Sequence, residues 1–169
     1  LYTGKVSGFC IVSSDSDFTR LATRLREAGM QVFGIGERKT PNPFIVACDK
    51  FIYIEILKSR TEEETTDSIS KTPAEKNTVD KITPKALRFI ATTIDDVADD
   101  DGWAFLGDVG SLLQKKQPNF DSRNYGFQKL TPLINSIPHF EIERREDSKG
   151  RKKLIYVKIK EKNTSKTKK

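Results

Sequence analysis

Cysteine and histidine are scarce in this 169-residue chain, which has two cysteines, Cys10 and Cys48, and a single histidine, His139. Both cysteines lie in apolar sequence, where a free thiol behaves as a small buried hydrophobe. A disulfide framework is therefore not expected, and a reducing compartment is indicated. The chain has no His/Cys cluster, so a zinc site is not expected either. For His139 we predict a packing or surface role, not a catalytic one.

Long apolar runs are also missing from the chain. No run approaches the roughly 20 residues that a membrane-spanning helix needs, and no signal peptide is visible. We therefore predict a cytoplasmic protein that does not contact a membrane. The first residue is Leu1, which stands in the middle of a pattern without a start signal, so we also suspect an N-terminal truncation.

Charge is abundant but unevenly distributed along the chain. The formal net charge is +6, and residues 141–169 hold 12 Lys and Arg against 5 Asp and Glu. Residues 1–57 are close to neutral, with 7 basic and 6 acidic side chains. The basic charge is therefore a property of the C-terminal end, and such asymmetry indicates a polyanionic partner.

The first half of the chain is organised around residues 9–17, Phe-Cys-Ile-Val-Ser-Ser-Asp-Ser-Asp. The continuous apolar run predicts a strand buried on both faces, as in a parallel sheet. The polar residues then fall at the carboxyl end of this strand, where open α/β sheets bind ligands. Asp15 and Asp17 are two residues apart, so in extended geometry they share a side and could hold Mg²⁺ or Mn²⁺.

A capping role for the same residues stands beside the metal site. A helix is expected to begin here, and Asp or Ser is the usual N-cap residue. A second Asp in the first turn is favoured by the helix dipole, by about 0.3–1 kcal/mol. This segment alone therefore leaves open whether Asp15 and Asp17 cap a helix or ligate a cation.

Strands and helices alternate through the first 57 residues. The apolar patterns predict strands at 8–13, 31–35 and 51–57, with helices at 18–28 and 44–48. The order strand–helix–strand–helix–strand indicates a parallel, three-layer α/β unit over residues 1–57.

The composition changes after this unit. Residues 58–81 are acidic, rich in Ser and Thr and poor in apolar side chains, which is typical of a flexible linker. A second domain is predicted over residues 82–160, followed by a basic disordered tail at 161–169. Its first helix begins at Thr83 as the N-cap residue and Pro84 at the first helical position.

The second domain is predicted to contain three helices and a hairpin. Further helices are expected from about residues 108 and 121, with a break or a late start at Pro132. Apolar and charged residues then alternate from residue 140, residues 147–150 form a turn, and residues 154–160 form the returning strand. Three helices followed by a hairpin are typical of a winged helix.

Basic side chains gather on this predicted wing. Lysines and arginines here could neutralise the phosphates of a nucleic acid, or they could merely protect an edge strand from unwanted pairing. We favour nucleic acid because the cluster carries charge of one sign. The cluster consists of Arg144, Arg145, Lys149, Arg151, Lys152 and Lys153.

Residues 1–57 resemble the second half of an NYN domain of the LabA-like type. The motifs that carry the resemblance are the Ser-Asp-Ser-Asp-Phe core at 14–18, Gly-Ile-Gly-Glu at 34–37, Thr-Pro at 40–41 and the apolar segment 44–51. The resemblance implies a PIN-like α/β fold and a metal-dependent ribonuclease. The first strand of the family, with its Asp and Asn motif, would lie upstream of the first residue.

The NYN resemblance also implies roles for individual residues. Asp15 and Asp17 match the paired aspartates of the family, which ligate the Mg²⁺ or Mn²⁺ that activates water against an RNA phosphodiester. Residues that would position the phosphate or the ligands are Ser13, Ser14 and Ser16. A further acidic residue of the family would also lie upstream, so we expect this chain on its own to be inactive or unable to fold its first domain properly.

Residues 82–160 resemble an OST-HTH/LOTUS domain. The resemblance is carried by Gly-Trp-Ala at 102–104, Phe-Asp-Ser-Arg-Asn-Tyr-Gly-Phe at 120–127 and Phe-Glu-Ile at 140–142. It implies a winged helix that binds RNA, including G-quadruplex or single-stranded RNA, and that also has the potential to bind a protein partner.

Two hypotheses for the function follow from these resemblances. The first is an RNA-binding protein of the metal-dependent NYN ribonuclease type, in which the OST-HTH module presents the RNA. The alternative is a non-catalytic adaptor that binds RNA or a protein, with the NYN half as a scaffold. Only the first requires Asp15 and Asp17 to ligate a metal ion.

Overall fold

The computed structural model describes residues 6–57, 80–146 and 153–160. The chain divides into two compact units, which are described separately. The first contains Leu1–Lys81 and Leu113–Gln128, and the second contains Ile82–Leu112 and Lys129–Lys169. The predicted linker and the predicted tail lie almost entirely outside the described residues, so the predicted domain boundaries remain predictions.

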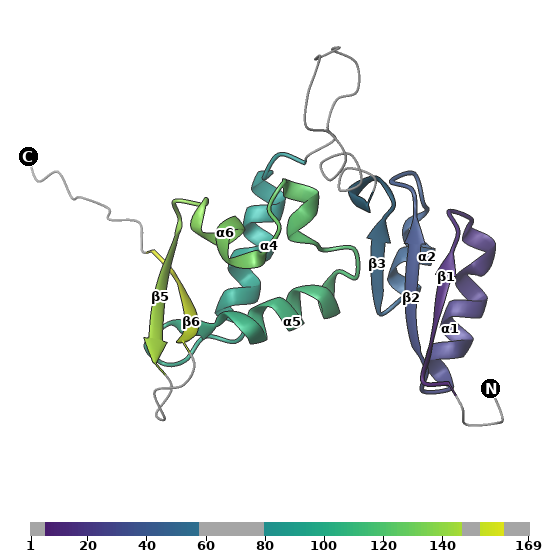
Figure 1. Cartoon of the computed structure of the whole chain (residues 1–169). Coiled ribbons are helices and arrows are strands. Elements are labelled where there is room, and N and C mark those ends of the chain that lie inside the picture. The colour runs from purple at the N-terminus through teal and green to yellow at the C-terminus, as the bar shows by residue number, and fades with distance from the viewer. Residues whose placement is uncertain (1–5, 58–79, 147–152, 161–169) are drawn as a thin grey trace, which may run out of the picture. The chain divides into compact units, whose positions relative to one another are not determined.

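A three-stranded parallel sheet forms the centre of the first unit (Figure 1). Its strands are β1 (Gly8–Val12), β2 (Gln31–Gly36) and β3 (Lys50–Tyr53), in the order β1-β2-β3. Its helices are α1 (Thr19–Glu27) and α2 (Asn42–Ala47), and the short 3₁₀ helix η1 (Ser16–Phe18) precedes α1. The predicted parallel α/β class is thus confirmed for this unit, but the predicted three layers are not found among the described residues, because only one face of the sheet is buried.

The core of the first unit lies between the helices and one face of this sheet. Every second residue of the central strand faces it, and two of these residues, Gly34 and Gly36, lack a side chain. A Cβ added at Gly34 would come within 2.5 Å of the Phe51 ring and 2.8 Å of Cys48 Sγ, so the ring packs directly on the backbone. The buried hydrophobic residues are Ile11, Ala22, Leu25, Val32, Phe44, Ile45, Ala47, Cys48 and Phe51.

The predicted third strand is shorter in the structure than in the sequence prediction. It was expected over residues 51–57, but β3 ends at Tyr53 and the chain turns at once. The Ile54 amide donates to the Gly36 carbonyl at 2.9 Å, and the Leu57 amide donates back to the Ile54 carbonyl at 3.1 Å. The first of these hydrogen bonds still joins the chain to β2, whereas the second closes a local turn, which ends the strand although the residues have high β propensity.

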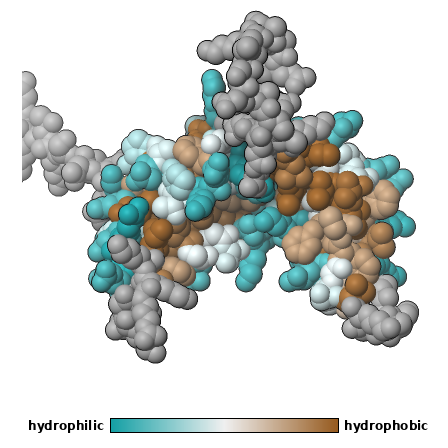
Figure 2. Space-filling model, in the orientation of Figure 1, coloured by the Kyte–Doolittle hydropathy of each residue, from teal (hydrophilic) through white to brown (hydrophobic). Residues whose placement is uncertain are grey.

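The other face of the parallel sheet carries exposed apolar side chains. Val12 is 68% exposed and Phe33 is 38% exposed, and the exposed Cys10 lies opposite Phe33 in the pairing register. Figure 2 shows hydrophobic surface on the part of the first unit that contains β1 and β2. The prediction that both cysteines are buried is therefore wrong for Cys10, because odd-numbered residues of β1 face the helices and Cys10 faces away from them.

Helices and an antiparallel sheet make up the second unit. Helix α4 (Pro84–Asp95) begins as predicted, because the Thr83 hydroxyl accepts a hydrogen bond from the Ala86 amide at 3.2 Å. Helix α5 (Leu106–Lys116) begins in this unit and continues into the segment that is grouped with the first. Helix α6 (Leu130–Asn135) has Pro132 as its third residue. The predicted late start is thus confirmed, since an amide in the first turn has no intrahelical partner to lose.

The helical segment expected from residue 121 forms one short 3₁₀ helix, η2 (Ser122–Tyr125), before α6. Asp121 caps η2 by accepting from the Arg123 amide at 2.9 Å. Gly126 ends it in the left-handed conformation, with φ of 82°. The interval between η2 and α6 separates what the sequence predicted as one helical stretch.

The predicted hairpin is present, and a third strand joins it (Figure 1). Strands β5 (Phe140–Glu146) and β6 (Lys153–Ile159) pair antiparallel, and β4 (Trp103–Phe105) pairs with β6 on its other side. The sheet order is therefore β4-β6-β5. One face of the sheet packs on the helices through Ala104, Phe140 and Val157, which are all buried. This arrangement is a winged helix, as expected.

Candidate functional site

The two candidate aspartates lie where the sequence predicted, at the carboxyl end of β1. The Ser13 amide donates to the Ile35 carbonyl at 2.9 Å, which continues the pairing with β2 by one residue. The chain then leaves the sheet and enters η1, with Asp15 as the N-cap residue. Asp15 Oδ1 accepts from the Asp17 amide at 3.0 Å, and both side chains are exposed. The capping role that the sequence left open is thus present.

The serines of this loop hold its backbone together. Ser13 Oγ accepts a hydrogen bond from the Asp15 amide at 3.1 Å. Ser14 Oγ accepts from the Glu37 amide at 2.9 Å and so connects the end of β1 to the end of β2. The backbone carbonyl of Ser16 accepts from the Thr19 hydroxyl at 2.5 Å. These contacts fix the loop that presents the two aspartates at the sheet edge.

Few acidic side chains in the described part of the chain converge at this edge of the sheet. Among the residues that the structure describes, no group of three His, Cys, Asp or Glu side chains could hold a metal ion. One oxygen of Asp15 already serves as a cap, and Glu37 pairs with Lys39 at 2.6 Å. Mg²⁺ is usually held by one or two carboxylates together with waters and substrate phosphates. Among the described residues, the acidic ligands offered at this edge are therefore at most the pair Asp15 and Asp17, and no third acidic side chain joins them.

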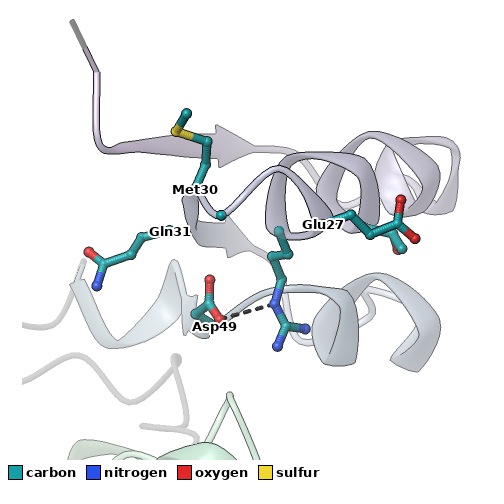
Figure 3. Close-up of a pocket in the computed structure, with 7 residues that line it drawn as sticks. Glu27, Met30, Gln31 and Asp49 are labelled. Carbon is teal, nitrogen blue, oxygen red and sulfur yellow. Dashed lines mark ion pairs between the residues drawn. The ribbon is translucent and has the colours of Figure 1, made fainter. Parts of the chain in front are cut away.

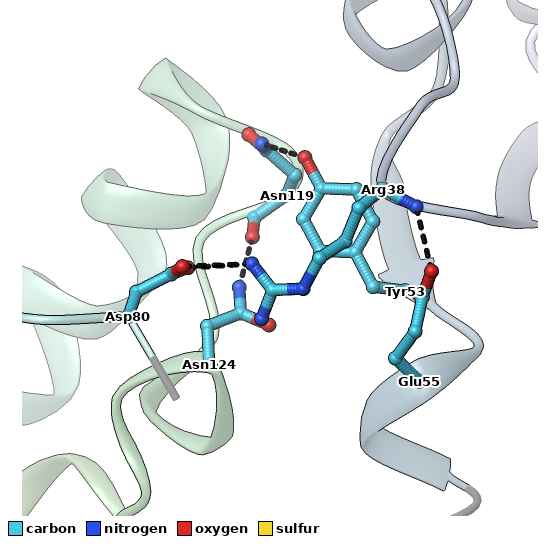
Figure 4. Close-up of polar contacts among 6 residues, drawn as sticks. All are labelled: Arg38, Tyr53, Glu55, Asp80, Asn119 and Asn124. Carbon is cyan, nitrogen blue, oxygen red and sulfur yellow. Dashed lines mark hydrogen bonds and ion pairs between the residues drawn. The ribbon is translucent and has the colours of Figure 1, made fainter. Parts of the chain in front are cut away.

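A polar network occupies the ends of β2 and β3 in the same unit (Figure 4). Glu55 Oε1 accepts from the Arg38 amide at 3.0 Å, and the Arg38 guanidinium pairs with Asp80 at 2.8 Å. The same guanidinium lies over the Tyr53 ring, 5.4 Å from its centroid, and the Tyr53 hydroxyl accepts from Asn119 Nδ2 at 2.7 Å. The guanidinium of Arg38 is therefore held in place by the Asp80 carboxylate and the Tyr53 ring.

A pocket of about 470 Å³ opens at the opposite end of the strands from Asp15 (Figure 3). Gln31, the first residue of β2, lines it. Its charged residues are already paired, because Arg26 Nε lies 3.0 Å from Asp49 Oδ1 and Asp49 Oδ2 accepts from the Val32 amide at 2.8 Å. This pocket is separate from the predicted site, and its ion pair ties α1 to the start of β3.

The basic cluster of the wing is divided between the two faces of its sheet. Arg144 and Arg145 are neighbours on β5, so their side chains leave the strand on opposite sides. Lys153 is the first residue of β6 and pairs in register with Glu146. The other three predicted contacts, Lys149, Arg151 and Lys152, lie outside the described residues.

Arg145 lies against two aromatic rings. Its Cζ is 5.0 Å from the centroid of Trp103 and 4.6 Å from the centroid of Tyr156. Its Nε and Nη2 atoms donate to Glu143 Oε2 at 3.1 and 2.9 Å, and this hydrogen bond raises the pKa of Arg145 further above its usual value. A second cation, Lys158, places its Nζ 5.9 Å from the Trp103 centroid and donates to the Asp101 carbonyl at 2.6 Å.

The aromatic residues of this face were missed by reasoning from the sequence. Trp103 was named only as part of the Gly-Trp-Ala motif at 102–104, and Tyr156 only as part of the returning strand. A signal was available, because Tyr156 and Lys158 occupy positions of β6 that alternate with the buried Val157. The pairing of β4 with β6, which brings Trp103 opposite Lys158, could not be derived from the alternation.

Family models match both parts of the chain. Residues 1–55 match the NYN domain, and residues 75–151 match the OST-HTH/LOTUS domain. The two resemblances drawn from the sequence are thereby confirmed. A segment that matches the NYN domain is thus followed in this chain by one that matches the OST-HTH/LOTUS domain, and this combination supports an RNA-associated function.

Two solved structures are similar to this chain. An uncharacterized protein from Nitrosomonas europaea, determined by solution NMR, is 32% identical, covers 56% of this chain and 92% of its own, and has a TM-score of 0.43. A solution NMR structure of part of a protein from Chromobacterium violaceum is 27% identical, covers 48% of this chain and 86% of its own, and has a TM-score of 0.38. No curated protein matches the chain.

None of the helices in the described ranges is long and apolar enough to cross a membrane.

Proposed function

We propose that this protein binds RNA through its OST-HTH/LOTUS unit, with the wing hairpin contacting the phosphate backbone. The observation that carries the proposal is the charge of the hairpin, which begins within the segment that matches the OST-HTH/LOTUS domain and continues beyond it. Residues 140–160 hold eight Lys and Arg against four Asp and Glu. Cationic side chains on a wing release counterions from a polyanion, which favours binding without a need for base-specific contacts. The proposed contacts are Arg144, Arg145, Lys149, Arg151, Lys152 and Lys153.

Charge reversal tests this proposal. The triple variant Arg151→Glu, Lys152→Glu and Lys153→Glu is expected to weaken binding of a labelled single-stranded RNA and to flatten the dependence of affinity on salt. The matched control reverses three exposed basic residues elsewhere, Lys81, Lys85 and Arg88, and changes the net charge equally. If both triple variants lose the same affinity, the wing is not the contact surface, and only the net charge matters.

A metal-dependent ribonuclease activity is a second, finer proposal. It is supported by the match of residues 1–55 to the NYN domain and by the position of Asp15 and Asp17 at the carboxyl end of a parallel strand. Mg²⁺ or Mn²⁺ would be the cofactor, and Ser13, Ser14 and Ser16 would hold the loop that faces the phosphate. The ligand set would need acidic groups besides those that the described residues bring together.

The test of this second proposal separates catalysis from binding. The chain is incubated with labelled RNA and Mn²⁺ or Mg²⁺, beside the double variant Asp15→Asn and Asp17→Asn. Cleavage that requires the metal and is lost in the double variant, while RNA binding is retained, supports a ribonuclease. If the wild-type chain binds RNA but cleaves none with either metal, the non-catalytic adaptor, which binds RNA or a protein, replaces it.

A further inference from the structure

We propose that the outer face of the β4-β6-β5 sheet is a stacking surface for unpaired RNA bases. This inference rests on the proposed RNA binding and adds a location and a ligand class to it. The ligand is a single-stranded segment or loop, whose bases are free to leave their own stack. The residues concerned are Trp103, Phe105, Arg145, Tyr156 and Lys158.

The pairing register places these side chains on one face. Trp103 is opposite Lys158 and Phe105 is opposite Tyr156 across the β4–β6 pair. Tyr156 is in turn opposite Glu143 across the β6–β5 pair, and Arg145 lies two residues beyond Glu143 on the same side. The side chains that alternate with them face the core. The set is thus assembled from all three strands of the sheet.

The composition of this face is unusual for a surface that only meets water. Trp103, Phe105 and Tyr156 are all partly exposed, and the rings of Phe105 and Tyr156 have centroids 5.8 Å apart. The solvated face of an antiparallel sheet is normally polar. Three neighbouring aromatic side chains on it provide large, flat areas that a further planar group could cover.

The basic side chains on this face indicate which kind of planar group would cover the rings. The Arg145 guanidinium already lies over Trp103 and Tyr156, so both rings attract a flat, delocalised group. Nucleic-acid bases stack both on aromatic rings and on arginine guanidinium planes. Arg145 and Lys158 are also within reach of the phosphates on either side of a stacked base. A polyanionic strand with exposed bases could therefore stack its bases on the rings and pair its phosphates with the excess positive charge of the hairpin.

Double-stranded RNA is less able to stack on these rings. In a duplex the faces of the bases are covered by their neighbours, and proteins read such RNA mostly through its shape, its 2′-hydroxyls and its phosphates. A surface that works by stacking should therefore favour single strands over duplexes of equal charge. This preference distinguishes the inference from a wing that contacts only phosphates, which would bind both forms.

The decisive experiment compares affinities for three probes. They are a labelled oligoadenylate of about 12 nucleotides, which is within the range of single-strand binding sites, the same strand with abasic positions, and an RNA duplex of similar length. For the wild-type chain, we expect the strongest binding to the intact single strand. Trp103→Leu and Tyr156→Leu should each weaken this binding by about tenfold, and they should have little effect on binding to the abasic strand.

Two further variants distinguish the loss of a stacking ring from the loss of folding. Trp103→Phe keeps a stacking ring and should restore most of the affinity lost in Trp103→Leu. Phe33→Leu removes a partly exposed aromatic ring from the first unit and should leave the affinity unchanged. Equal sensitivity of the intact and abasic strands to Trp103→Leu would overturn the inference.

The experiment also separates the inference from the proposed function. If RNA binds and depends on the wing charges, but single strand and duplex bind alike, the stacking surface is disproved and RNA binding stands. If no probe binds at all, the proposed function fails together with the inference. Unchanged single-strand affinity in both leucine variants would also overturn it and would leave this face to a protein partner.

Discussion

The guanidinium of Arg145 lies over both Trp103 and Tyr156, with its Cζ 5.0 and 4.6 Å from the two ring centroids. The three residues come from β5, β4 and β6, so a single side chain connects every strand of the sheet. Without tertiary packing, a two-stranded hairpin is marginally stable in water. The contact therefore helps to hold the wing on the third strand.

Removing the charge of this side chain should loosen the wing. Arg145→Met keeps an apolar stem but loses the cation over both rings and the ion pair with Glu143. We expect a lower melting temperature, measured by circular dichroism. Arg144→Met provides the control, because Arg144 is exposed on the other face of the same strand. Equal melting temperatures of the two variants would show that the ring contacts contribute nothing to stability.

Filling the space above Gly34 should destabilise the first unit. In Gly34→Ala the new methyl group would meet the Phe51 ring and Cys48 Sγ, and such overpacking typically costs about 1–3 kcal/mol. Urea unfolding measures the loss. Phe51→Leu creates room beside the methyl group, so the double variant should be less destabilised than the sum of the two single variants. Strict additivity would contradict the proposed contact.

The N-cap of α4 should contribute measurably to the second unit. Thr83→Ala removes the oxygen that accepts from the Ala86 amide, which should lower the free energy of unfolding by about 1 kcal/mol. Thr92→Ala, at an exposed position inside the same helix, is the matched control. Alanine is the better helix former there, so Thr92→Ala should be neutral or slightly stabilising. Chemical denaturation of both variants decides the point.

The two cysteines should differ in reactivity and in their effect on pH stability. Burial raises the pKa of Cys48 to about 11 from its ordinary value of 9.0, whereas Cys10 is exposed. Iodoacetamide should therefore alkylate Cys10 in the native protein at mildly alkaline pH, and both cysteines in urea, as mass spectrometry would show.

The same shift has a defined sign for stability. Because the pKa of Cys48 is higher in the folded state, its contribution is fully present below pH 9 and is lost as the pH rises through about 11. The free energy of unfolding should fall over this interval in the wild-type protein. Cys48→Ala should reduce the fall, and an identical pH profile in that variant would contradict the assignment.

Much of the fold could be predicted because its signals are local. The apolar runs at β1 and β2, the Thr83-Pro84 start of α4 and the alternation in β5 each depend on a few neighbouring residues. The length of β3 could not be predicted, because a local turn between Ile54 and Leu57 ends the strand within a segment that has high β propensity. The exposure of Cys10 was missed for a similar reason. The apolar run of β1 is typical of a strand that is buried on both faces, and it gives no sign that one face of this strand is exposed.

The candidate site was predicted less completely. The position of Asp15 and Asp17 after a parallel strand followed from sequence order alone. The hydrogen bond between Asp15 Oδ1 and the Asp17 amide shows that capping is present, and the number of converging carboxylates could be counted only in three dimensions. On the wing, the sequence indicated one cluster of charge. In the structure, the alternation of side chains along β5 directs Arg144 and Arg145 to opposite faces of the sheet. Arg145 then lies over the rings of Trp103 and Tyr156, of which Trp103 is distant in sequence.

Trp103 is the only tryptophan of the chain, and it lies beneath two cations on the second unit. The intrinsic tryptophan emission of the whole protein therefore originates from one strand of one sheet. The first unit contributes tyrosine but no tryptophan, so it is silent when only tryptophan is excited. The fluorescence of Trp103 is thus an intrinsic probe. A change in its emission wavelength or intensity reports on the β4-β6-β5 sheet without a chemical dye.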